Sequence, residues 1–178
     1  MPSDSIIDVT PDVKDGSRGM LAFHGQMYFC VLGRAGVVPP AEKQEGDGAT
    51  PAGIWRLRRV FYRADKISKP ETVLDVVDIT KDMGWCDAPE HPEYNRLVPL
   101  PFDASHEKMW REDDVYDIVV ELGYNDDPPL PGLGSAIFMH LMRPDAAPTA
   151  GCVALPLPAL REILQGCSTN TAIRISEK

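Results

Sequence analysis

Alternating apolar and polar residues dominate the chain and predict a domain built mainly from β-strands. In the clearest segment, residues 115–122 (VYDIVVEL), every second residue from Tyr116 to Leu122 is apolar. Asp117 and Glu121 lie between them, so we expect a strand with one buried and one solvent-facing side. Further strands are expected at residues 20–23, 27–32, 54–62, 73–79, 136–141 and 171–175.

Two short segments predict helices. The first covers Ser105 to Glu112, with Ser105 as its N-cap. The second covers Pro158 to Gln165, with proline in the first turn and Gly166 after the end. Its buried stripe would consist of Leu157, Leu160, Ile163 and Leu164. Many strands with two short helices predict a mainly β (α+β) fold.

The length of the chain fits one domain. With 178 residues the chain is long enough to bury a real core and too short for two ordinary domains, so we expect residues 1–178 to form a single unit. Prolines and glycines gather in three loops, at residues 37–53, 86–102 and 125–134. Loops around a rigid sheet are where binding residues tend to lie.

The charge balance argues against polyanionic partners. The chain has 27 acidic and 18 basic residues and a formal net charge of −9, so neither nucleic acid nor membrane insertion is expected. The first residues show no basic region followed by an apolar one. The sequence as written therefore predicts a cytoplasmic protein, or a periplasmic one if a leader is missing.

The four cysteines show no metal-binding or disulfide pattern. Cys30, Cys86, Cys152 and Cys167 are spread without any C-x-x-C spacing. We expect neither a metal site nor a disulfide framework.

One cysteine is placed for chemistry. Cys152 follows Gly151, and His140 stands near the end of a predicted strand, with a loop from Leu141 to Thr149 between them. A nucleophilic thiol needs a base within hydrogen-bond reach and donors for the oxyanion. Gly151 lets the backbone turn sharply, and a helix start just ahead would lower the pKa of the thiol. Taken separately, the thiol and the imidazole are better explained as packed core residues.

The order and spacing of these residues resemble a known family. His140 followed by Thr149-Ala150-Gly151-Cys152 resembles the signature of the L,D-transpeptidase catalytic domain, or YkuD domain, which is a histidine, a loop and then [Ser/Thr]-His-Gly-Cys. The upstream segment GDGATPAGIWRL, residues 46–57, is similar to the T-P-x-G-x-[FY/W] strand entry of that family. The resemblance covers residues 20–175 and implies a β-rich, sandwich-like domain with short helices.

The resemblance also implies roles for site residues. Cys152 would be the nucleophile, His140 the general base, and the backbone carbonyl of Leu141 the group that orients the ring. Backbone N–H groups around Gly151 and Cys152 would hold the oxyanion. The implied partner is a peptidoglycan stem peptide or muropeptide, and no cofactor is implied.

Two positions depart from the family pattern. Ala150 replaces the second histidine of the motif, and Ala154 replaces an arginine that often follows the cysteine. Without that arginine, Arg143 or Arg96 would have to bind a substrate carboxylate. Thr149 is expected to be a further substrate-binding residue. Each of the two arginines also has the simpler explanation of a solvated surface residue.

Three functions fit these residues. The first is an acyltransferase that cleaves an L,D bond and passes the acyl group from a thioester to an amine. The second is a cytoplasmic L,D-carboxypeptidase of muropeptide recycling, in which water is the acceptor. The third is a binding module that keeps the fold without catalysis. The sequence gives no prediction of oligomeric state.

Overall fold

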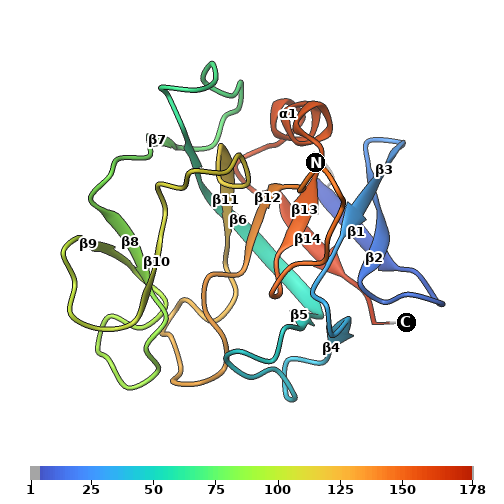
Figure 1. The fold of residues 1–178 in the computed structure, drawn as a ribbon. Coiled ribbons are helices and arrows are strands. Elements are labelled where there is room, and N and C mark those ends of the chain that lie inside the picture. Colours follow the sequence, from blue (N-terminus) through green and yellow to red (C-terminus); the bar gives the residue numbers. More distant parts are fainter. Residues whose placement is uncertain (1–4, 178) are drawn as a thin grey trace.

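The computed structural model describes residues 5–177, and within them it shows fourteen strands and one helix, α1 (Leu157–Gln165) (Figure 1). The strands are β1 (Ile6–Pro11), β2 (Arg18–Phe23), β3 (Gln26–Val31), β4 (Val37–Val38), β5 (Thr50–Pro51), β6 (Gly53–Tyr62), β7 (Val76–Asp78), β8 (Met83–Cys86), β9 (Leu97–Pro99), β10 (His106–Lys108), β11 (Ile118–Leu122), β12 (Phe138–Leu141), β13 (Val153–Leu155) and β14 (Ala172–Ile175). The predicted mainly β fold is confirmed.

The main sheet closes on itself. Its nine strands run in the order β11-β12-β13-β3-β2-β1-β14-β6-β7, and β6 pairs with β11 as well as with β14. Because the two ends of the order meet at β6, the sheet forms a barrel-like wall. Strand β7 pairs with the part of the β6 edge that β14 does not cover. The expected sandwich is therefore one curled sheet whose opposite walls face each other.

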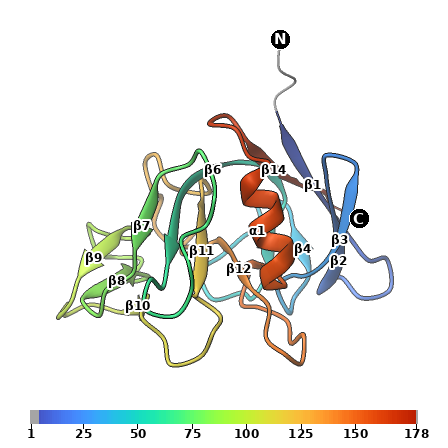
Figure 2. The ribbon, with the colours of Figure 1, turned by 90° about the horizontal axis from the view of Figure 1, so that it is seen from above.

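Helix α1 covers one end of the barrel. It lies at the top of the barrel in Figure 1 and over its interior in Figure 2. Leu160, Ile163 and Leu164 are fully buried in the barrel core, while Leu157 is only partly buried. The prediction of this helix, with Gly166 at its end, is confirmed. No helix among residues 5–177 is long and apolar enough to cross a membrane.

The other predicted helix is wrong. Within residues 105–112 the chain forms strand β10, which pairs antiparallel with β8 through His106–Cys86 and Glu107–Trp85. A helix of about two turns has little stability of its own. The backbone hydrogen bonds and packing available beside β8 therefore decide the conformation.

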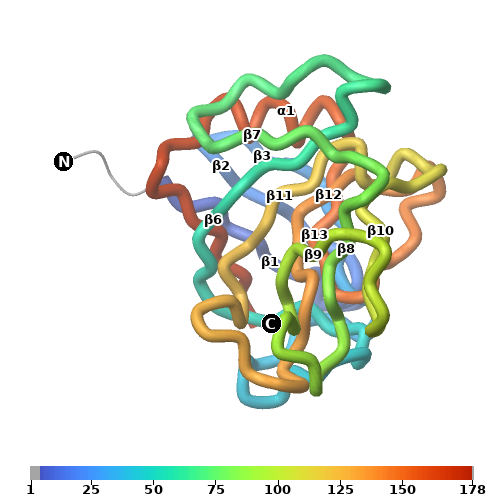
Figure 3. Tube along the Cα trace, turned by 90° about the vertical axis from the view of Figure 1, so that its left-hand side faces the viewer, coloured from blue at the N-terminus to red at the C-terminus, as the bar shows by residue number. Residues whose placement is uncertain are grey.

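Strand β11 is buried on both faces, although the sequence suggested one solvent-facing side. Ile118 and Val120 point into the barrel core, whereas Val119 belongs to a second apolar cluster with Trp85 and Phe138. That cluster lies under a separate three-stranded sheet of order β10-β8-β9, which Figure 3 shows next to the barrel wall. The small sheet covers the face that would otherwise be solvated.

Asn95 links the small sheet to the barrel. This residue lies between β8 and β9 and is only 6 % exposed. Its side-chain oxygen accepts hydrogen bonds from Trp85 Nε1 at 2.9 Å and from the Ala136 backbone N–H at 3.0 Å. Its side-chain nitrogen donates to the carbonyl of Asn125 at 2.7 Å. One amide thus fixes three segments that are distant in sequence.

Replacing Asn95 with alanine should lower the free energy of unfolding by about 3 kcal/mol or more, because buried donors and acceptors lose their partners together. Denaturant unfolding followed by tryptophan fluorescence measures the change. Asn170→Ala is the matched control, since Asn170 is exposed and bonds only Arg56 through its side-chain oxygen. Equal losses in the two variants would contradict the role given to Asn95.

Candidate active site

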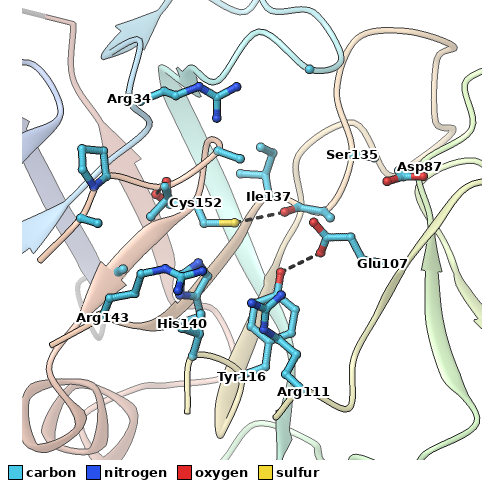
Figure 4. Close-up of a pocket in the computed structure, with 18 of the residues that line it drawn as sticks. Arg34, Asp87, Glu107, Arg111, Tyr116, Ser135, Ile137, His140, Arg143 and Cys152 are labelled. Atoms are coloured by element: carbon cyan, nitrogen blue, oxygen red, sulfur yellow. Dashed lines mark hydrogen bonds between the residues drawn. The ribbon is translucent and has the colours of Figure 1, made fainter. Parts of the chain in front are cut away.

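A pocket of about 350 Å³ lies between the barrel wall and the small sheet. Cys152, His140 and Ala154 line it from the barrel side, and Glu107 and Asp87 line it from the side of the small sheet (Figure 4). The pocket therefore brings together segments that are far apart in the sequence.

The pairing of β12 with β13 places Cys152 and His140 on one face. The two strands are parallel, and His140 lies opposite Ala154. Because side chains alternate along a strand, Cys152 and Ala154 point to the same side as His140, and Val153 points into the barrel core. The sequence prediction missed β13, although it identified both residues.

The turn before Cys152 is held by Thr149. The Thr149 hydroxyl donates to the Cys152 carbonyl at 2.7 Å and accepts the Gly151 N–H at 3.1 Å. Gly151 has φ +142°, and a Cβ there would lie 2.8 Å from the Ala49 carbonyl oxygen, so the turn requires glycine. Thr149 lines the pocket as expected for a substrate-binding residue, but its hydroxyl is engaged in shaping the turn.

His140 is held as a neutral imidazole. Its Nδ1 lies 2.9 Å from the Leu141 carbonyl oxygen, and since a carbonyl only accepts, Nδ1 carries the hydrogen and Nε2 keeps its lone pair. Burial lowers the pKa of His140 to about 4, and the bond to Leu141 opposes this shift only in part. The imidazole is therefore uncharged near pH 7.

Cys152 is a neutral thiol in this structure. The Sγ donates to the Ala136 carbonyl at 3.2 Å and accepts the Phe138 N–H at 3.4 Å. Burial raises the pKa of Cys152 to about 12, and the negative charge of Glu107 adds to the effect. The expectation of a lowered pKa is wrong, because β13 separates Cys152 from α1 and the helix start does not adjoin the thiol.

Three arginines line the pocket, and Figure 4 shows Arg34 and Arg143 on different sides of Cys152. Arg111 is engaged by Asp113 at 2.7 and 2.8 Å, whereas Arg143 approaches Asp113 only to 3.8 Å. Arg34 lies in the loop after β3, and no local motif in the sequence marks it.

Arg96, the other predicted carboxylate-binding residue, lies outside this pocket. It lines a separate surface depression together with Tyr94 and Pro128. Its neighbour Asn95 takes the inward position and forms the bonds that connect the small sheet to the barrel. The structure therefore brings Arg143, but not Arg96, to Cys152.

Two further polar residues of the site were missed. The Tyr116 hydroxyl donates to Glu107 Oε2 at 2.7 Å, and the Tyr116 ring lies 5.4 Å from the His140 ring, measured between centroids. The sequence pattern predicts a helix at Glu107 and a buried strand position at Tyr116. In the structure, residues 106–108 form a strand, which places Glu107 on the same face of the small sheet as Trp85.

Fold and site together thus define a mainly β domain with a cysteine and a neutral histidine in a charged pocket. The family model of the L,D-transpeptidase catalytic domain, YkuD, matches residues 13–175. The chain belongs to this family, which connects it with peptidoglycan. Comparison with curated proteins and with solved structures gives no significant match.

The buried thiol predicts a particular pH dependence. Alkylation of Cys152 by iodoacetamide should become about tenfold faster with each pH unit from 7 to 10, because only the thiolate reacts and its fraction keeps rising below the pKa. Peptide mass mapping follows this residue separately from the other cysteines. Free N-acetylcysteine is the reference, and its rate should level off above pH 9. A plateau for Cys152 below pH 9 would disprove the neutral resting thiol.

Replacing Thr149 with valine should remove both bonds that hold the turn. We expect a loss of about 1–2 kcal/mol in unfolding free energy, measured by thermal or urea unfolding. Thr149→Ser should restore most of the loss because it keeps the hydroxyl. Thr10→Val, at an exposed strand position, is the control and should change stability by less than about 0.5 kcal/mol. Similar losses at both positions would argue against the turn-holding role.

Proposed function

We propose that this chain is a cysteine acyltransferase that cleaves peptidoglycan stem peptides between the L-centre of a diamino acid and a terminal D-amino acid. The observation that carries the proposal is the position of Cys152 and His140 on one face of paired strands at a charged pocket. Membership of the L,D-transpeptidase catalytic domain family supports the same chemistry.

In the first step Sγ of Cys152 attacks the carbonyl carbon, and a C–S bond forms. The thiol proton passes to Nε2 of His140, the nitrogen that carries the lone pair. Because the thiol is neutral at rest, proton transfer accompanies attack and does not precede it. The C–N bond then breaks, His140 returns the proton to the leaving amine, and a thioester remains.

The oxyanion of this step needs donors. The Gly151 N–H is already bound to Thr149 Oγ1. The Cys152 N–H has no hydrogen-bond partner among residues 5–177, so we assign it as a donor to the oxyanion. Gly151 contributes by allowing the turn that presents this amide.

In this proposal, the arginine side chains bind the carboxylate of the substrate. Ala154, which stands where the family often has arginine, faces the pocket beside His140. Arg34 and Arg143 reach the same pocket from two loops, and neither forms a close ion pair among residues 5–177. A guanidinium binds a carboxylate through two parallel hydrogen bonds.

The thioester accepts either of two nucleophiles. An amine from a second stem peptide gives a cross-link, and water gives a carboxypeptidase, with no cofactor in either case. The partner is accordingly a stem peptide of the wall or a free muropeptide.

Cys152→Ala should abolish release of the terminal D-amino acid from a tetrapeptide stem. His140→Ala should lower kcat by about 10² to 10⁴-fold, because the general base is lost. Mass spectrometry of the products provides the measurement. Cys167→Ala is the control, since Cys167 is as buried as Cys152 but lies in the barrel core. A wild-type protein that binds the stem without releasing any product would instead be a binding module.

A further inference from the structure

Glu107 presents a fixed carboxylate to the pocket of Cys152. It comes from β10, on the small sheet, and Figure 4 shows it on the side of Cys152 away from Arg143. Its Oε2 accepts the Tyr116 hydroxyl at 2.7 Å. Within residues 5–177 its Oε1 has no hydrogen-bond partner, so one carboxylate oxygen is available to a ligand.

Tyr116 holds this carboxylate in place. The tyrosine is 5 % exposed, and the Arg111 guanidinium lies over its ring at 5.0 Å from the centroid. The charge of Arg111 is engaged by Asp113, and no cationic side chain described in the structure lies within ion-pair distance of Glu107. Glu107 is therefore held by Tyr116 and forms no ion pair within residues 5–177.

The pocket carries charges of both signs. Arg34 and Arg143 line it close to Cys152, and Glu107 and Asp87 line it from the small sheet. Arg111 also lies beside Tyr116, but Asp113 engages its charge. Asp87 Oδ1 is buried and has no hydrogen-bond partner within the described part of the chain. A buried acceptor without a donor is costly, so this side is complementary to a ligand that brings N–H groups and positive charge.

We propose that Glu107 determines specificity by binding a primary ammonium group of the stem peptide while the reacting carbonyl lies at Cys152. The inference rests on the proposed function, and it names the part of the substrate that the acidic side recognises. The ammonium belongs to the side chain of the diamino acid in the cleaved stem, because the amine of an acceptor stem must be uncharged to attack the thioester. The ammonium neutralises a charge that otherwise opposes loss of the thiol proton.

Two tetrapeptide stems that differ only in acetylation of the side-chain amine test the inference. For the wild type, acetylation should lower kcat/KM by about 10- to 100-fold, the range expected when a hydrogen bond to a charged group is lost. Glu107→Gln should lower kcat/KM for the free-amine stem by a similar factor, and it should not lower kcat/KM for the acetylated stem. Glutamine can still accept the Tyr116 hydroxyl, so the site keeps its shape.

Glu112→Gln is the matched control, because Glu112 is exposed and does not line the Cys152 pocket. It should keep the wild-type preference for the free amine. Equal activity of the wild type on both stems, or an equal loss on both stems in Glu107→Gln, would overturn the inference. Absence of turnover of either stem by the wild type would instead overturn the proposed function, and this inference with it.

A single-turnover experiment with Glu107→Gln isolates the step at which the ammonium is bound. Slower release of the D-amino acid from the free-amine stem indicates that Glu107 binds the ammonium of the cleaved stem. Normal release, with or without a lower yield of cross-linked dimer, would contradict the inference.

A substrate-free measurement checks the electrostatic consequence. Iodoacetamide is uncharged, so at pH 8 it should alkylate Cys152 about fivefold faster in Glu107→Gln than in the wild type. Cys30 and Cys167, buried in the barrel core, serve as internal controls and should keep their wild-type rates. An unchanged rate at Cys152 would contradict the influence of Glu107, and faster labelling of all three cysteines would show a loosened fold instead.

Discussion

The parallel pairing of β12 with β13 is the constraint on which the site depends. Parallel neighbours cannot be joined by a tight hairpin, so the chain must run back alongside β12 through residues 142–152 before it enters β13. That return ends at the turn held by Thr149 and made possible by Gly151. Without the turn, β13 would enter the sheet in another register, and a shift of one residue would point Cys152 into the barrel core.

Burial makes a charge on either Cys152 or His140 unfavourable. The thiol of Cys152, with a pKa of about 12, and the imidazole of His140, with a pKa of about 4, are both most stable without charge. In the proposed mechanism, the charges that develop on the imidazole and the oxyanion during attack must therefore be stabilised by what enters the pocket and by the fixed dipoles around it. The charges of the pocket wall thus act on the chemistry of the thiol as well as on recognition.

The sequence pattern predicted several elements whose apolar residues face the barrel interior, such as β6, β14 and α1, but it missed β1 and β13, which also face the interior. It failed at β10, because the strand that fixes its conformation lies about twenty residues away and leaves no local periodicity. Cys152 and His140 were found through a motif, and their shared face could not be derived once β13 was missed. Arg34 and Glu107 reach the site only through tertiary folding, so residue type alone did not mark them.

In the proposed function, recognition and reactivity are located on separate elements that one residue connects. The barrel supplies Cys152 and His140, and the small sheet supplies Glu107. Asn95 binds the N–H of Ala136, whose backbone is held at φ +53°, and the carbonyl of Ala136 accepts the thiol hydrogen of Cys152. Two hydrogen bonds therefore connect the small sheet with the thiol of Cys152. Substitutions that reshape the acidic side without disturbing Asn95 can alter which substrate binds while the thiol stays in place.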